Sequence, residues 1–201
     1  MKKFLESREA EFYLINESRR KVLLQLAKAI KEAKERNNFS EIVFVCTHNS
    51  RRSQIAQMLA SPSAEYLEIS GIGAYFGGTE VTAFYLNSVE ALRNVGFKID
   101  KAEENETNPK YRVTYTQNSP PTTAFSKLYS NTINPKEKFI AVMVCAQADE
   151  NCPFVPGAGA RINLPYSDPK AYDNTHEALQ KYLETCEIIG RELLFVFKNV
   201  K

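Results

Sequence analysis

The chain has 201 residues, of which 43% are hydrophobic, and a formal net charge of +2. This length suits one catalytic domain with an appended segment, and the composition permits an ordinary core. The small net charge excludes nothing about fold but gives no basis for binding nucleic acid or a membrane surface, and no apolar run is long enough to cross a bilayer.

The first 38 residues predict a helical extension. Apolar residues recur there at helical spacing, and Asn16 or Ser18 is placed to cap the helix that carries them. A shorter helix over Phe4–Leu14 precedes it, and Asn37–Ser40 reads as the junction to the next unit. The opening run, MKKFLESREAEF, is charged and lacks a signal-peptide core. We therefore expect a cytoplasmic protein whose four cysteines are reduced and more suited to catalysis than to structural disulfides.

The segment Glu41–Ala56 predicts a strand, a tight loop and the start of a helix. Ile42–Val45 is a continuous apolar run rich in β-branched residues, which is typical of a strand buried on both faces. Cys46 ends this run, and Arg52 and Ser53 follow after five residues. The segment therefore contains Cys-x5-Arg-Ser between a buried strand and a helix.

This spacing suits the binding of an oxyanion above a cysteine. Loop N–H groups and the positive end of the helix dipole can surround one anion, and Arg52 offers a planar fork of donors. Such surroundings lower a cysteine pKa, so we expect Cys46 to be a thiolate nucleophile that accepts a hydrogen bond from Ser53. The alternative is a buried structural cysteine. The residues expected to bind the oxyanion are Thr47, His48, Asn49, Ser50, Arg51, Arg52 and Ser53.

At these residues the chain resembles a known family. The run VCTHNSRRSQIAQ, residues 45–57, is similar to the phosphate loop of the low-molecular-weight tyrosine phosphatase superfamily. Within that superfamily it is most similar to the thioredoxin-coupled arsenate reductases. His48 stands where a glycine is common, which raises the question of an unusual φ at this residue, and Arg51 stands where a second cysteine is common. The resemblance covers about residues 41–198.

The middle of the chain predicts further elements with weaker patterns. Ser61–Ser63, with a central proline, is expected to end the loop helix. Residues 102–110, AEENETNPK, are polar and turn-rich. The expected elements are a strand over Glu65–Ser70, a helix over Val81–Val95, an edge strand over Tyr111–Gln117 and a short helix over Thr123–Ser130.

A second cysteine pair follows another buried strand. Lys138–Cys145 is apolar and ends in a cysteine, as the first strand does. Because the carboxyl ends of parallel strands share one edge of a sheet, we expect Cys46 and Cys145 to face the same crevice. Cys152 follows with six residues between it and Cys145, a second pair that again resembles the thioredoxin-coupled arsenate reductases. The alternative is two cysteines that never meet.

An aspartate follows the last predicted strand. Arg161–Leu164 reads as that strand, and Asp168-Pro169 lies just beyond it on the same edge. The pair resembles the general-acid motif of the superfamily, although an isolated Asp-Pro is also a common turn. Thr175–Phe197 predicts the closing helix, whose apolar face includes Cys186, and we interpret this cysteine as a core residue.

The sequence therefore predicts an α/β protein with two parts. The resemblance implies a three-layer, low-molecular-weight phosphatase-like domain with a four-stranded parallel sheet over residues 39–201, after a helical extension over residues 1–38. We predict no metal site, because Cys-x2-Cys is absent and the two histidines are His48 and His176.

The resemblance also implies a function, arsenate reduction with thioredoxin as an external reductant and without a tightly bound cofactor. The implied catalytic residues are Cys46, Arg52, Asp168, Cys145 and Cys152. The first alternative is a low-molecular-weight protein tyrosine phosphatase that hydrolyses phosphate monoesters and needs neither Cys145 nor Cys152. The second is a protein without catalytic activity that binds an anion or a partner through a degenerate loop.

Overall fold

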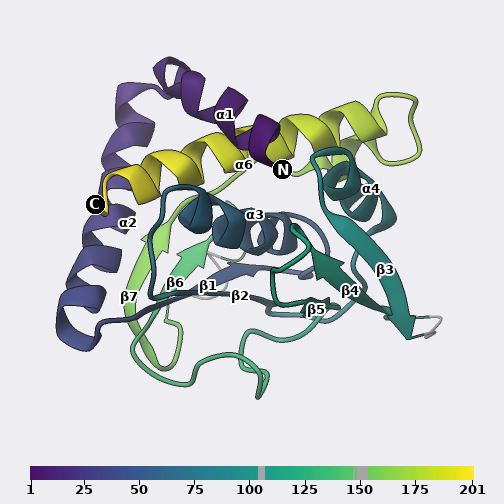
Figure 1. Ribbon diagram of the computed structural model, residues 1–201. Coiled ribbons are helices and arrows are strands. Elements are labelled where there is room, and N and C mark those ends of the chain that lie inside the picture. The colour runs from purple at the N-terminus through teal and green to yellow at the C-terminus, as the bar shows by residue number, and fades with distance from the viewer. Residues whose placement is uncertain (104–106, 147, 149–153) are drawn as a thin grey trace.

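The core of the molecule is a four-stranded parallel sheet. The computed structural model describes residues 1–103, 107–146, 148 and 154–201. The strand order is β2-β1-β6-β7 (Figure 1), which confirms the predicted α/β fold around a four-stranded parallel sheet. The four strands are β1 (Ser40–Cys46), β2 (Ile72–Gly78), β6 (Phe139–Met143) and β7 (Ala158–Asn163).

The two central strands are the two apolar runs of the sequence. β1 lies between β2 and β6, and its residue Phe44 pairs with Phe76 on one side and Val142 on the other. Every residue of β6 is buried, as a strand covered on both faces requires. This parallel register brings the carboxyl ends of β1 and β6, and so the residues that follow them, to the same edge of the sheet.

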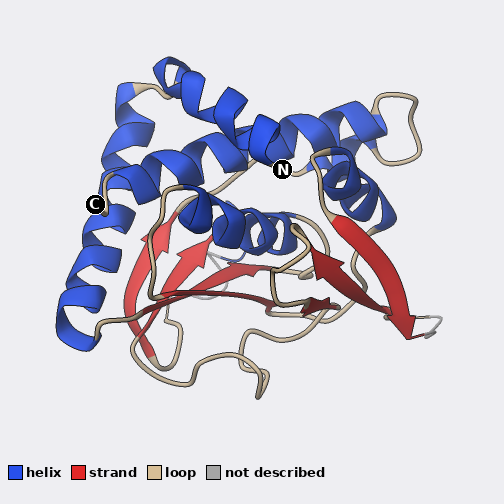
Figure 2. Cartoon of the chain, viewed as in Figure 1, coloured by secondary structure: helices blue, strands red, loops and turns tan. Residues whose placement is uncertain are grey.

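In the described part of the chain, three helices that follow β1 accompany this sheet. They are α3 (Arg52–Tyr66), α4 (Leu86–Asn94) and α6 (Ala178–Lys198). In Figure 2, α3 lies between the central sheet and α6, and it contacts both. Cys186 of α6 is fully buried, which confirms its interpretation as a core residue.

The N-terminal extension is helical, as predicted. It consists of α1 (Lys2–Ala10), a 3-10 turn (Phe12–Leu14) and α2 (Glu17–Asn37). The side chain of Asn16 accepts a hydrogen bond from the Arg19 N–H at 2.9 Å, so the expected cap is present. The apolar stripe of α2 packs against α6, β1 and β7, which identifies its partner as the catalytic region of the same chain.

Two predictions between the loop helix and the next strand are wrong. α3 continues through Pro62 to Tyr66, where a break at Ser61–Ser63 was expected. Burial of Leu59, Ala60 and Ala64 outweighs the hydrogen bond that a proline removes from a helix interior. The second strand consequently lies not at Glu65–Ser70 but at Ile72–Gly78, after a turn at Gly71 with a φ of +72°.

A second, antiparallel sheet lies beside the first (Figure 1), and the sequence did not predict it as a sheet. Its order is β3-β4-β5, so the predicted edge strand is its central strand. The helix predicted over Thr123–Ser130 is wrong, because Thr122–Ala124 pairs with Tyr111–Val113 instead. Its strands are β3 (Lys98–Glu103), β4 (Lys110–Thr114) and β5 (Thr122–Ala124).

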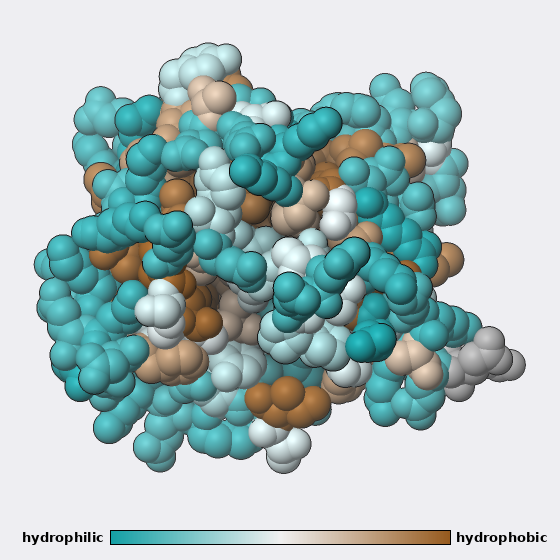
Figure 3. Space-filling view, in the orientation of Figure 1, coloured by the Kyte–Doolittle hydropathy of each residue, from teal (hydrophilic) through white to brown (hydrophobic). Residues whose placement is uncertain are grey.

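The apolar side chains are mainly internal. The face in Figure 3 is largely hydrophilic, with separate apolar areas. Among the described residues, no helix combines the length and apolarity that a membrane span requires.

The predicted helix over Val81–Val95 is present in shortened form, because α4 begins at Leu86 and ends before Gly96, whose φ is +112°.

Candidate active site

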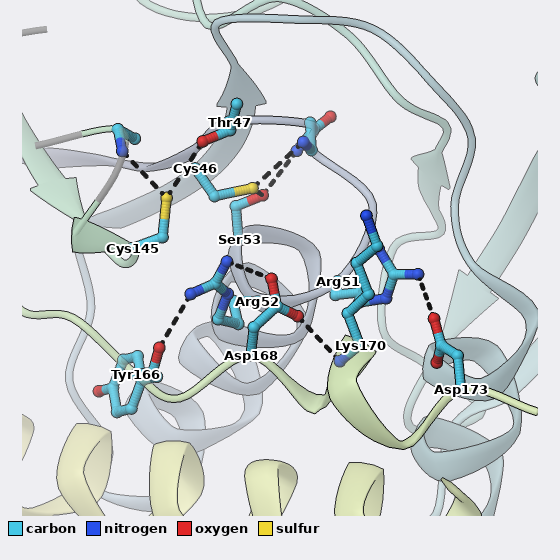
Figure 4. A network of polar contacts seen from close by, with 12 residues as sticks. Cys46, Thr47, Arg51, Arg52, Ser53, Cys145, Tyr166, Asp168, Lys170 and Asp173 are labelled. Atoms are coloured by element: carbon cyan, nitrogen blue, oxygen red, sulfur yellow. Dashed lines mark hydrogen bonds and ion pairs between the residues drawn. The ribbon is translucent and has the colours of Figure 1, made fainter. Parts of the chain in front are cut away.

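The loop between β1 and α3 wraps around the Cys46 sulfur. Cys46 is the last residue of β1, and α3 begins at Arg52. The Asn49 N–H donates to Cys46 Sγ at 3.1 Å, and Ser53 Oγ lies 3.0 Å from the same atom (Figure 4). The side chain is 4% exposed, so the thiol lies at the base of the loop. The predicted strand, loop and helix, and the predicted contact with Ser53, are therefore confirmed.

Asn49 holds the loop in shape from within. Its φ is +48°, a left-handed conformation that asparagine tolerates better than most residues. Its Nδ2 donates to Ser53 Oγ at 2.8 Å, and its carbonyl accepts from Gln54 Nε2 at 2.7 Å. The positive φ thus falls on Asn49 and not on His48. The His48 ring lies at the rim instead, with Nε2 3.4 Å from the Glu80 carboxylate.

The predicted anion-binding arginine and the predicted general acid are in contact. Arg52 Nη2 donates to Asp168 Oδ2 at 2.5 Å, and Nη1 donates to the Tyr166 carbonyl at 2.9 Å. The other Asp168 oxygen accepts from the Lys170 N–H at 3.0 Å and caps a 3-10 turn over Pro169–Tyr172. Figure 4 shows both side chains beneath the cysteine loop. The structure thereby brings Asp168 to the loop, from 116 residues further along the chain.

Arg51 belongs to a different network. Its Nη2 donates to Asp173 at 2.6 Å and its Nε to the Tyr182 hydroxyl at 2.6 Å. Its guanidinium also lies 4.1 Å from the centre of the Tyr85 ring, within the range of a cation–π contact. These contacts tie the loop to α6. Sequence reasoning missed Asp173, Tyr182 and Tyr85, since no local pattern links residues so far apart.

The second cysteine lies against the loop. Cys145 lies two residues beyond the end of β6 and is 1% exposed. Its Sγ lies 3.5 Å from Thr47 Oγ1 and accepts the Ala148 N–H at 3.2 Å, the same i+3 geometry that Asn49 forms with Cys46. Figure 4 shows the two sulfur atoms on the same side of the sheet edge. Cys152, the predicted relay partner, lies outside the described residues.

The prediction that the loop lowers the Cys46 pKa is wrong for this structure. Burial raises the pKa of the Cys46 thiol, and the Ser53 hydrogen bonds and the Arg52 charge oppose this effect without overcoming it. Cys145 raises the pKa further. A physical reason is that the Arg52 charge is shared with the Asp168 carboxylate, which weakens its field at the sulfur.

The described residues contain no group of three His, Cys, Asp or Glu side chains that could hold a metal ion. The functional groups that the structure brings together here are sulfur, hydroxyl and carboxylate groups, loop N–H groups and the Arg52 guanidinium. Together they can bind a tetrahedral anion, attack it and protonate a leaving oxygen.

Comparisons with known proteins agree with this geometry. No family model matches the chain. Arsenate reductases from Staphylococcus aureus are 29% identical to it over 130 residues, which span 64% of this chain and 77% of theirs. Their resemblance in sequence is modest but extends over most of the relatives' length.

Solved structures show the shared fold. A low-molecular-weight phosphotyrosine phosphatase from Vibrio cholerae matches with a TM-score of 0.52 and 12% identity, over 79% of this chain and 95% of the other. A YwlE mutant from Bacillus subtilis matches with a TM-score of 0.53 and 15% identity, over 79% and 97%. The chain therefore has the fold of the low-molecular-weight protein tyrosine phosphatase superfamily, and its sequence is similar to that of arsenate reductases.

Proposed function

We propose that this protein is an arsenate reductase that uses Cys46 as nucleophile and passes the resulting disulfide to thioredoxin. The observation that carries the proposal is the position of Cys145, whose sulfur lies 3.5 Å from Thr47 Oγ1 of the nucleophile loop. A phosphatase has no need of a second buried thiol there. The similarity to proteins named arsenate reductase supports the same choice.

The first step joins arsenate to the enzyme. The loop N–H groups and Arg52 hold the anion, the Cys46 thiol passes its proton to an oxygen of the bound arsenate, and its sulfur attacks arsenic. One arsenic–oxygen bond breaks, and Asp168 supplies the proton with which that oxygen leaves as water. Arsenic remains in its +5 state in the thioester-like adduct. The Asp168 contact with Arg52 supports this role, because it places the acid beside the anion-binding group.

The next steps reduce arsenic and regenerate the thiol. The Cys145 thiolate attacks the Cys46 sulfur, the sulfur–arsenic bond breaks, and its electron pair stays on arsenic as arsenite is released. Cys152 then attacks Cys145, which frees Cys46 and leaves a Cys145–Cys152 disulfide. Thioredoxin, the reductant that the resemblance implies, returns this disulfide to two thiols. We propose that the cycle takes place in the cytoplasm, where such thiols are kept reduced.

A phosphatase is the second candidate, because the matching solved structures include protein tyrosine phosphatases. Hydrolysis of a phosphate monoester needs Cys46, Arg52 and Asp168 but neither Cys145 nor Cys152. The two functions therefore share the nucleophile, the anion-binding arginine and the acid, and they differ in whether the other two cysteines are needed.

The deciding experiment is an assay of arsenate-dependent NADPH oxidation with thioredoxin and thioredoxin reductase, run beside hydrolysis of p-nitrophenyl phosphate. We expect reductase turnover that is lost in Cys145→Ser, with phosphatase activity unaffected by that substitution. Cys186→Ala is the matched control, because Cys186 is also a buried cysteine and lies on α6, outside the loop between β1 and α3. Phosphate ester hydrolysis without arsenate reduction would favour the second candidate.

A further inference from the structure

The nucleophile loop is hydrogen-bonded to residues 126–129, a segment that lies outside the central sheet. Ser126 follows β5 of the second sheet and is 1% exposed. Its Oγ donates to the His48 carbonyl at 3.0 Å and accepts from the Thr82 N–H at 2.9 Å. One hydroxyl thus links the loop to the segment that follows β2.

Asn108 fixes the position of Ser126. Its Nδ2 donates to the Ser126 carbonyl at 2.8 Å, and its Oδ1 accepts from the Ser126 N–H at 3.0 Å. A side-chain amide that bonds both backbone groups of one residue leaves that residue little freedom. Asn108 comes from the connection between β3 and β4, so this clamp joins two parts of the second sheet.

The next residue reaches the centre of the loop. The Lys127 N–H donates to Asn49 Oδ1 at 2.8 Å. Asn49 in turn donates its Nδ2 to Ser53 and its N–H to Cys46 Sγ. Two hydrogen bonds, both made by Asn49, therefore connect the Lys127 N–H to the Cys46 sulfur. Asn49 is also the loop residue with a positive φ.

The same segment is anchored to β2. The Lys127 carbonyl accepts from the Gly78 N–H at 2.9 Å, and the Tyr129 N–H donates to the Gly78 carbonyl at 2.9 Å. A Cβ at Gly78 would lie 2.5 Å from the Thr47 carbonyl oxygen, and one at Gly77 would lie 2.2 Å from Tyr129 Cα, so these glycines let β2 approach the loop and this segment closely. The segment is thus held on both sides and can act as a rigid support.

We propose that Asn108 and Ser126 are positioning residues that hold the Cys46 loop in its anion-binding shape. They act through His48 and Asn49 and do not touch the reacting atoms. Without the clamp, the His48 carbonyl loses one of its two hydroxyl donors and keeps Thr82 Oγ1, and the Lys127 N–H that Asn49 Oδ1 accepts is no longer held in place. The left-handed Asn49 then relaxes, and its N–H no longer points at the sulfur. This inference rests on the proposed role of Cys46 as an anion-binding nucleophile.

The experiment measures the reactivity of Cys46 in the full-length protein. Reduced wild type, Ser126→Ala and Asn108→Ala are alkylated with iodoacetamide at a series of pH values, with and without inorganic phosphate. The Cys46 peptide is quantified by mass spectrometry, which gives the midpoint of its pH profile and the phosphate concentration that protects it. Ser126→Thr retains a hydroxyl, and Asn131→Ala removes an amide that bonds within its own turn, through the Ile133 N–H. Thermal unfolding of each variant is recorded in parallel.

We expect Ser126→Ala and Asn108→Ala to need about tenfold more phosphate for protection. This is the loss of affinity that corresponds to the net free energy of one hydrogen bond. Their pH midpoints rise, because the thiolate loses the Asn49 N–H. Ser126→Thr and Asn131→Ala stay near wild type. Unchanged midpoints and unchanged protection in folded Ser126→Ala and Asn108→Ala overturn the inference. If phosphate fails to protect Cys46 in the wild type, the proposed function itself fails.

Discussion

Arg52 and Asp168 form an ion pair with an N–O distance of 2.5 Å, although 116 residues separate them in the chain. Arg52 begins α3, and Asp168 precedes the 3-10 turn after β7. The pair joins the anion-binding half of the proposed site to its acidic half. A change at Asp168 should therefore affect the rate of the proposed reaction.

The Asp168→Asn variant should bind oxyanion but turn over more slowly. Loss of a general acid typically costs a factor of about 10²–10⁴ in rate. Arsenate-dependent NADPH oxidation and p-nitrophenyl phosphate hydrolysis measure the rate, and phosphate protection of Cys46 measures binding. Asp173→Asn is the matched control, since Asp173 also pairs with a loop arginine, Arg51. Equal rates for wild type and Asp168→Asn would show that Asp168 is not the acid.

Lys127 predicts a pH dependence of stability. Its ammonium lies 2.9 Å from the centre of the Phe76 ring, and burial lowers the pKa of Lys127 from 10.5 to about 7. Between these values the unfolded chain binds more protons than the folded one, so this group favours folding increasingly as pH rises from 7 to 10.5. The free-energy cost of burying the charged Lys127 side chain is therefore greatest at and below pH 7.

Lys127→Met should therefore be more stable than wild type near pH 6 by a few kcal/mol, and the difference should shrink towards pH 10. Urea unfolding at both pH values tests this expectation. Lys136→Met, a change at an exposed lysine of the same segment, should show no such trend. A stability difference that stays constant with pH contradicts the shifted pKa. The substitution leaves the Lys127 N–H, and hence the contact with Asn49, in place.

The N-terminal extension is joined to the catalytic region by a buried ion pair. Arg19 of α2 donates Nε and Nη2 to Glu192 of α6 at 2.9–3.0 Å, and its guanidinium lies 4.7 Å from the centre of the Tyr166 ring. Glu192 is 5% exposed, so removing Arg19 leaves a buried carboxylate without this partner. The division at residue 38 itself stays a prediction.

Arg19→Met should lower the free energy of unfolding by roughly 3 kcal/mol, near the lower end of the range for breaking a buried pair. Arg20→Met is the control, because Arg20 bonds the carbonyls of Ile15 and Phe12 and meets α6 through the Phe195 ring, at 5.4 Å, and not through a carboxylate. It should cost less. Urea denaturation of both variants decides the point, and equal losses would mean that the extension is held by its apolar stripe and not by Glu192.

The sequence predicted those parts of the fold that local pattern determines. β1 contains the apolar run Ile42–Val45 and β6 is apolar throughout, and their parallel pairing places Cys46 and Cys145 at one edge. The loop between β1 and α3 was predictable for the same reason, since Cys-x5-Arg-Ser links a buried strand to a helix. Asp168 followed from its place after the last strand. In each of these cases a short stretch of residues contains the information.

The remaining features depend on contacts between distant residues. β2 is IGAYFGG, and its glycines, poor strand formers, are required because Tyr129 and Thr47 approach Gly77 and Gly78 closely. β3 is largely exposed and polar, so no alternation marks it as a strand. The prediction of a lowered Cys46 pKa is wrong for a similar reason, because burial of the thiol raises this pKa and the extent of burial depends on residues outside the loop sequence.

The most direct test of the account maps disulfides after one turnover. Reduced protein is treated with arsenate in the absence of thioredoxin, quenched in acid and analysed by peptide mass spectrometry. Wild type should accumulate the Cys145–Cys152 bond, and Cys152→Ser should trap Cys46–Cys145, while Cys186 remains a free thiol in both. If arsenate produces neither bond while p-nitrophenyl phosphate is hydrolysed, the protein is a phosphatase and not an arsenate reductase.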